Sequence, residues 1–284
     1  MKEQKVIFFA PQYWGELTKF NRFYHSTYSF KPFINVAVKG AESHFDKFTT
    51  LYGLAIKLKP MLSEDEKELK EKGFSKAIRS KELSSVIESA FIELYASLNC
   101  MMKVLSGVFN NYKGIPSDST RKLFRNAREG KIDTRVPSTI TDILKNATWF
   151  DDLRKIRDEL VHSEIGFCSN ANDIITYIHP NLESNGKALV INDVLAELDK
   201  YKNYVNILLG RIYHTLNESL NDKKVEQVCG MAYGRILMRK VAFKEAKDFN
   251  SGECISYTWF EKEENPTCPF ANDCGAYKNI MNGS

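Results

Sequence analysis

The sequence predicts a mainly α-helical protein: an antiparallel helical bundle with a β-hairpin insertion and a small mixed N-terminal region. Apolar residues recur every three or four positions over three long stretches, which is the period of an amphipathic helix. Only 15 glycines and 8 prolines occur in 284 residues, too few for the many tight turns of an all-β protein. Helices of this length pack as antiparallel bundles.

Composition and charge exclude several classes of protein. With 43% hydrophobic and 12% aromatic residues, the chain can bury a large core and is not globally disordered. Its 40 Lys and Arg against 36 Asp and Glu give a net charge of +4, which excludes a strongly basic nucleic-acid coat and an acidic solvating tail. The sequence contains neither a signal peptide nor the roughly 18–20 apolar residues that span a bilayer. We therefore expect a cytoplasmic protein with no membrane partner.

The chain divides into three predicted segments: residues 1–61, 62–222 and 223–284. The first is mixed, with short strands at Lys5–Ala10 and Phe33–Val38 and a helix at Ser43–Leu58. Its dense Phe and Tyr residues favour core packing over base stacking.

Helices dominate the second segment. Ser63 and Glu66 form a capping box that opens a short helix ended by Gly73. Ser80 caps a long helix over about 81–112, whose apolar stripe includes Leu83, Ile87, Phe91, Leu94, Leu98, Met101 and Leu105. A polar connection at 113–137 leads to a second helix at about Thr139–His162.

A β-hairpin and a third long helix complete the bundle. Apolar or alternating runs at Asp173–His179 and Lys187–Ile191 are separated by a turn-rich stretch, which is typical of a hairpin. Asn192 caps the third helix, at about Asp193–Asn221. Residues 223–284 are expected to form a helix over Val225–Phe249 and then an irregular tail that contains cysteines.

The motif with the most chemical content lies at the end of the second helix. Arg157 is followed at once by Asp158, and four residues separate Arg157 from His162. This motif on a bundle helix resembles the R-x4-6-H signature of the HEPN superfamily (higher eukaryotes and prokaryotes nucleotide-binding), over residues 62–222. The resemblance implies a metal-independent endoribonuclease that cleaves RNA at a homodimer cleft. It also implies a setting in phage defence or a toxin–antitoxin system, with an antitoxin or another regulatory partner.

The resemblance also implies a role for each residue of the motif. Arg157 would neutralise the scissile phosphate, because guanidinium stays charged and forks onto phosphate oxygens. His162 would act as general base or acid around the 2′-OH, since imidazole titrates near neutral pH. Asp158 would orient one of these two groups, and no cofactor is needed for catalysis. Some toxin members carry Tyr two residues after the His, where this chain has Glu164.

Helical geometry adds an observation that does not depend on the family. At 100° per residue, Arg157 falls inside the apolar arc of its helix, where a charge needs a partner or a wet cleft. Arg157 and His162 lie about 140° apart, so they can meet at one point only if the helix bends or ends near His162, or if a second chain completes the site.

Other interpretations of the motif stay open. Arg157 can pair with a core carboxylate, and His162 can sit at a helix C-terminus because the macrodipole favours it there. Some HEPN relatives lack activity and serve in binding or dimerisation. The alternative function is therefore a non-catalytic RNA- or nucleotide-binding or dimerisation module.

A basic stretch leads toward the motif. Residues 121–135 hold six basic and two acidic residues. Lys and Arg give sequence-independent affinity for phosphates, so Arg121, Lys122, Arg125 and Arg128 are candidate RNA contacts. The alternative is a solvated loop.

Four of the six cysteines lie near the C-terminal end: Cys229, Cys254, Cys268 and Cys274. Four thiolates can hold a zinc ion or an iron–sulfur cluster, and either would order an irregular tail. The alternative is four unbound thiols. Cys100 and the histidines outside the motif, His44 among them, are interpreted as structural.

Overall fold

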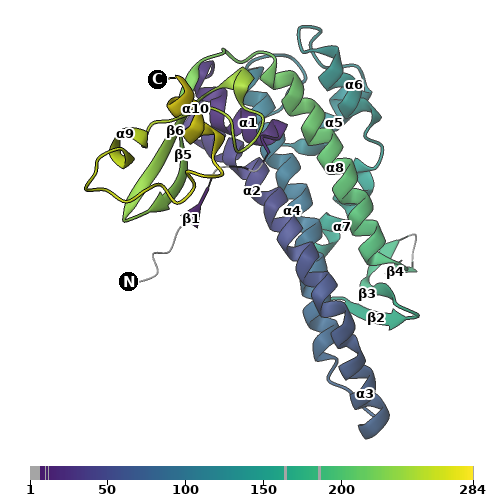
Figure 1. Cartoon of the computed structure of the whole chain (residues 1–284). Coiled ribbons are helices and arrows are strands. Elements are labelled where there is room, and N and C mark those ends of the chain that lie inside the picture. Colours follow the sequence, from purple (N-terminus) through teal and green to yellow (C-terminus); the bar gives the residue numbers. More distant parts are fainter. Residues whose placement is uncertain (1–6, 10, 12, 163–164, 185–186, 284) are drawn as a thin grey trace. The chain divides into compact units, whose positions relative to one another are not determined.

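A computed structural model describes residues 7–9, 11, 13–162, 165–184 and 187–283 (Figure 1). The chain forms two compact units. The helical unit is Phe30–Ile212, and the terminal unit combines Met1–Ser29 with Tyr213–Ser284. This division does not coincide with the segment boundaries predicted near residues 61 and 222.

The helical unit consists mainly of helices joined by short connections. The second and fourth helices run side by side, and the seventh packs on the fourth (Figure 1). The helices are α2 (Pro32–Leu58), α3 (Leu62–Lys72), α4 (Ile78–Val108), α5 (Thr120–Arg128), α6 (Ser138–Asn146), α7 (Phe150–His162) and α8 (Val194–Asn217).

Helix α4 confirms the longest predicted helix. Its apolar stripe is buried throughout, and Leu83, Leu94 and Leu105 are fully covered. The predicted cap is wrong, because the helix begins at Ile78 and Ser80 lies inside it. Ser80 is buried instead, and its hydroxyl donates to the carbonyl of Cys168 at 2.7 Å.

Two other predicted helix starts also need correction. Helix α3 begins at Leu62, so Ser63 is not its cap and donates to the carbonyl of Pro60. Gly73 does end α3, with a φ of 77° that suits glycine. At the start of α8, the carboxylate of Asp193 rather than Asn192 accepts from a backbone N–H, that of Ala196, at 3.1 Å.

Helix α2 replaces the strand that was predicted at Phe33–Val38. Pro32 stands in its first turn, where a missing N–H costs nothing. Ile34, Ala37, Val38 and Ala41 are then buried at helical spacing. The predicted helix at Ser43–Leu58 is confirmed as the continuation of α2.

The interface between α2 and α4 contains a buried carboxylate. Glu93 is 7% exposed, accepts a hydrogen bond from Lys47 and lies 2.6 Å from Nδ1 of His44. Burial acts to raise the pKa of this carboxyl, but the contacts with Lys47 and His44 outweigh it, so the pKa lies below its ordinary value.

The region 113–162 is more broken than the sequence predicted. The single helix expected at Thr139–His162 is two helices, α6 and α7, because the backbone leaves helical geometry at Ala147. The connection expected at 113–137 contains α5, whose N-cap Ser119 accepts from the backbone N–H of Lys122 at 3.2 Å.

The predicted β-hairpin is confirmed and gains a third strand. The sheet has the antiparallel order β2 (Phe167–Ala171), β3 (Ile174–Ser184) and β4 (Lys187–Ile191). Asn172 and Asp173 both have positive φ at the turn between β2 and β3, which is the conformation that tight hairpins favour.

The terminal unit joins both ends of the chain. Its helix α1 (Glu16–Phe23) packs on residues after 212, since Phe20 meets the ring of Tyr213 with centroids 5.3 Å apart. Its other elements are β1 (Ile7–Phe8), β5 (Lys224–Ala232), β6 (Arg235–Ala242), β7 (Glu253–Cys254), α9 (Tyr257–Phe260) and α10 (Gly275–Gly283). Of the strand predicted at 5–10, Ile7 and Phe8 form β1, whereas Lys5, Val6 and Ala10 lie outside the described residues.

The helix predicted at Val225–Phe249 is wrong. The segment forms strands β5 and β6 of an antiparallel sheet with order β1-β5-β6-β7. Tyr233 and Gly234 both have positive φ and make the two-residue turn. The mainly helical class is thus confirmed over the described residues, with two small antiparallel sheets. None of the described helices is long and apolar enough to cross a membrane.

Candidate functional site

Helix α7 carries the predicted Arg157 and Asp158 and packs against α4. The helix ends at His162, one of the conditions under which Arg157 and His162 could face one point. The side chain of His162 and the whole of Glu164 lie outside the described residues.

Arg157 stacks on an aromatic ring. Its guanidinium carbon lies 3.9 Å from the ring centroid of Tyr95 on α4, within cation–π range. Its Nη1 lies 3.0 Å from a carboxylate oxygen of Asp158. Its Nε is buried without a hydrogen-bond partner among the described residues. The helical wheel places Arg157 on the apolar side of its helix, where a charge needs a partner. The carboxylate of Asp158 and the ring face of Tyr95 are that partner.

Asp158 is shared between two arginines. Arg154 Nη1 lies 2.7 Å from its other carboxylate oxygen, and the Nε of Arg154 lies 3.8 Å from Asp151. Asp151 in turn pairs with Arg128 at the end of α5. We call these five residues the α7 charge network. Three guanidinium groups share two carboxylates, so the network has a formal charge of +1.

Stacked aromatic rings support Arg157 of the α7 charge network. Tyr95 is 4% exposed and stacks on Phe150, whose ring is 3.8 Å from that of Phe124 and nearly parallel to it. Burial raises the pKa of Tyr95, so its hydroxyl stays neutral. The hydrogen bond from Arg128 lowers the pKa of Asp151, so this carboxylate stays charged as its partner.

The basic stretch forms α5 and the loop after it. Arg121, Lys122 and Arg125 are exposed, and no ion pair within the described residues involves any of them. Arg121, Arg125 and Arg128 are spaced four and three residues apart and share one face of the helix. Arg128 joins this face to the α7 charge network through Asp151. The later Arg135 pairs with Asp133 and stacks on Tyr112.

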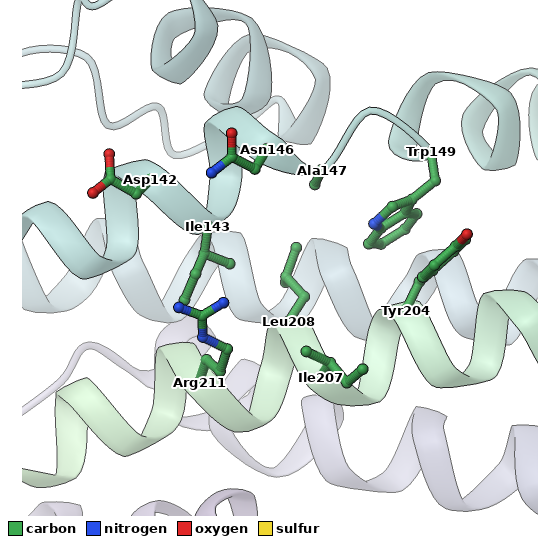
Figure 2. A pocket seen from close by; sticks show the side chains of 9 residues that line it. All are labelled: Asp142, Ile143, Asn146, Ala147, Trp149, Tyr204, Ile207, Leu208 and Arg211. Atoms are coloured by element: carbon green, nitrogen blue, oxygen red, sulfur yellow. The ribbon is translucent and has the colours of Figure 1, made fainter.

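A pocket that the sequence did not predict lies between α6 and α8 (Figure 2). Its volume is about 180 Å³. The rings of Trp149 and Tyr204 stack at one end, with centroids 5.5 Å apart and planes 15° apart. Asp142, Asn146 and Arg211 stand toward the other end, as Figure 2 shows.

The four predicted cysteine ligands, Cys229, Cys254, Cys268 and Cys274, are all buried and belong to one hydrophobic cluster of the terminal unit. None forms a disulfide. Within the described residues, no three His, Cys, Asp or Glu side chains are grouped closely enough to hold a single metal ion. Cys100 and Cys168 belong to the helical unit.

Sequence reasoning found Arg157 and Asp158 but missed their neighbours. The ion pairs within α7 could have been predicted from spacing, because Arg154 is three residues after Asp151 and four before Asp158. Tyr95 and the pocket residues required the packing of separate helices. Comparison of the chain with protein-family models, with curated proteins and with solved structures finds no match. The resemblance to HEPN proteins stays a prediction.

Proposed function

We propose that the protein is a HEPN-type, metal-independent endoribonuclease that acts at a homodimer cleft. The observation that carries the proposal is the placement of Arg157. Its guanidinium is stacked on Tyr95 and paired with Asp158, and it stands on the helix that ends at His162. A phosphate group would meet the accessible part of a guanidinium fork that Tyr95 and Asp158 already hold in place.

The chemistry follows from these residue types. Arg157 binds the scissile phosphate and offsets the charge that develops on it. His162 takes the proton of the RNA 2′-OH as that oxygen bonds to the adjacent phosphorus. The bond from phosphorus to the 5′-oxygen of the next nucleotide breaks, and that oxygen takes a proton from water, which leaves a 2′,3′-cyclic phosphate and a 5′-hydroxyl. Asp158 holds Arg157 and Arg154 in place. In this role it orients the arginine rather than the histidine.

The charge around the network supports an RNA substrate. The exposed face of α5 with Arg121 and Arg125 continues through Arg128 to the α7 charge network, and Lys122 stands beside it. An RNA strand lying along this face would contact these cations before it reached Arg157. Their contribution to the binding affinity would decrease as the salt concentration rises.

An apolar face supports the homodimer. Phe167, Ile178 and Val190 lie in register across β2, β3 and β4 and are 43%, 36% and 50% exposed. The sheet follows α7 directly along the chain. A second copy packed on this face is one of the arrangements that could complete the site, since Arg157 and His162 of one straight helix lie about 140° apart.

A second candidate function is a non-catalytic RNA- or nucleotide-binding module. The pocket between α6 and α8 favours it, because the stacked Trp149 and Tyr204 offer ring faces and Arg211 offers a cation. Bases stack on such rings. A defence or toxin–antitoxin setting, with a regulatory partner, is the context that the resemblance adds to either function.

The test compares RNA cleavage by the wild type, His162→Ala and Arg157→Lys in the presence of EDTA. We expect His162→Ala to lose roughly a hundredfold or more in rate, since the general base or acid is removed. Arg157→Lys keeps the charge but loses the fork, so it should also be impaired. His214→Ala is the matched control, because His214 is an exposed histidine of the terminal unit.

Equal cleavage by the wild type and His162→Ala would contradict the ribonuclease proposal. Saturable RNA binding without turnover, lost in Trp149→Ala, would favour the binding module instead. The same samples give the oligomeric state by light scattering, and Ile178→Lys should shift a dimer to monomer.

A further inference from the structure

The terminal unit gathers four thiols from four separate segments. Cys229 comes from β5, Cys254 from β7, Cys268 from the loop after α9, and Cys274 from the residue before α10. Each is between 6% and 8% exposed. All four belong to one cluster that is lined by Leu237, Phe260 and other apolar residues. The chain otherwise has only two cysteines, so this convergence is not a consequence of abundance.

Local structure directs these thiols inward. The register between β5 and β6 shifts between Val228 and Gly230, so Cys229 occupies a β-bulge. A bulge re-aims a side chain relative to the regular alternation. Cys254 is paired in register with Arg239 of β6. The backbone N–H of Cys274 donates to the carbonyl of Phe270 at 2.8 Å, which closes the loop that begins near Cys268.

A buried cation lies among the thiols. Arg239 is 2% exposed. Its Nη2 donates to the Sγ of Cys274 at 3.6 Å, and it also hydrogen-bonds the side chain of Cys229. Its Nη1 donates to the carbonyls of Phe249 and Ser251. Its Nε is buried without a partner, and none of the described partners of the guanidinium is a carboxylate.

An isolated buried charge is costly, so a guanidinium in this position requires a compensating negative charge. Free thiols carry no charge, and the described hydrogen-bond partners of the guanidinium are carbonyls and thiols. As free thiols, the four cysteines therefore leave Arg239 without a counter-ion.

We propose that Cys229, Cys254, Cys268 and Cys274 together bind a metal centre as thiolates, and that Arg239 is the buried counter-ion of this centre. Binding of the metal displaces the thiol protons. Four thiolates around a zinc ion, or around a [4Fe–4S] cluster in its oxidised state, leave a net charge of about −2. The cation of Arg239, with its N–H groups directed at two of the sulfurs, offsets part of that charge.

The spacing of the thiols bears on which of the two centres is bound. A zinc ion draws four sulfurs to about 2.3 Å from a single point. A [4Fe–4S] cluster offers a different iron to each thiolate and accepts a wider set. The four thiols belong to one cluster, and among the described residues they do not form a group that could hold a single ion. The iron–sulfur cluster is therefore the centre that we assign for the test.

The test is metal analysis of the full chain, produced with added iron and purified without oxygen. We expect about four iron atoms and four acid-labile sulfides per chain, with a broad visible absorption band. About one zinc per chain would support the thiolate centre and assign it to zinc. Protein that contains neither metal in stoichiometric amount, although folded by circular dichroism, would overturn the proposal.

Single variants assign the ligands. Cys254→Ser should lower the metal content at least severalfold, whereas Cys100→Ser, in the helical unit, should leave it unchanged. Arg239→Met should lower the reduction potential of a cluster, because the nearby cation and its N–H groups stabilise the reduced, more negative state. Equal metal content in the wild type and Cys254→Ser would also refute the proposed ligand set, without any bearing on the ribonuclease proposal.

Discussion

Replacing Glu93 with glutamine removes one negative charge from the interface between α2 and α4. Glutamine keeps nearly the same shape, so packing changes little. The charge-assisted contacts with Lys47 and His44 are lost. Both partners reach Glu93 from α2, so the change weakens a polar link between the two longest helices.

The expected cost follows from the exposure of the three side chains. Breaking a fully buried ion pair costs about 3–5 kcal/mol, whereas an exposed pair contributes about 0–1 kcal/mol. The side chain of Glu93 is 9% exposed, but those of His44 and Lys47 are 38% and 62% exposed. Solvent screens the pair at these two partners, and we expect a loss of about 1–2 kcal/mol in the free energy of unfolding.

The difference in stability between the wild type and Glu93→Gln should become smaller as the pH falls. The folded-state pKa of Glu93 lies below its ordinary value of 4.5. The stabilisation from the ionised carboxylate is therefore complete above that value and is lost as the pH falls below it. Wild type and Glu93→Gln should differ at about pH 7 and converge in acid.

The assay is urea unfolding followed by helical circular dichroism, at about pH 7 and about pH 3. Glu71→Gln is the control, since the pair of Glu71 with Lys67 is 60% and 75% exposed and should contribute under about 0.5 kcal/mol. Equal stability of Glu93→Gln and the wild type at neutral pH, or a difference that grows in acid, would refute the reasoning.

Two further predictions concern the helical unit. Tyr95→Leu should cost about 1–3 kcal/mol more than Tyr95→Phe in unfolding free energy, because only the phenyl ring preserves the face under Arg157; equal costs would show that the ring face contributes nothing. Gly114→Ala should destabilise by about 2 kcal/mol or more, because Gly114 has a φ of +85° and a Cβ there would collide with the carbonyl of Lys131. Gly130→Ala, at φ +64° with open space around it, should cost about 1 kcal/mol in the same urea-unfolding assay.

The parts of the fold that were predictable are those in which one face is buried along many turns. The stripe from Leu83 to Leu105 specifies α4 by itself, because each apolar residue is three or four positions from the next. The same holds for α8 and for the strands on either side of the β3–β4 turn. In these elements local pattern and tertiary burial agree.

The errors arose where local pattern and tertiary packing disagree. The run at Phe33–Val38 contains β-branched residues, but the helix of which it is the first part continues to Leu58 and decides its conformation. The apolar residues in the run at Val225–Phe249 fit the helical period as well as the strand period. Strand β5 forms beside β1, which comes from the distant N-terminal end of the chain, and no local signal reports that neighbour.

The candidate site was only partly predictable for the same reason. Arg157 and Asp158 could be found because they form a motif along one helix. Tyr95 stands on another helix, and only packing places it under Arg157. The cysteines could be counted in the sequence, but the burial of Arg239 follows from its register opposite Cys254, which the sequence does not reveal.

The discontinuous terminal unit has a consequence for the order of folding. The helical unit is a contiguous stretch and can fold while the chain is still being synthesised. Trp14 and Phe20 leave the ribosome before it, but their partners Asp248 and Tyr213 come after it. During most of translation, the side chains of Trp14 and Phe20 are therefore exposed, because the residues that bury them have not yet been synthesised. A nascent chain would be most exposed to aggregation and to chaperones in this interval, and the thiol cluster would be the last part of the molecule to form.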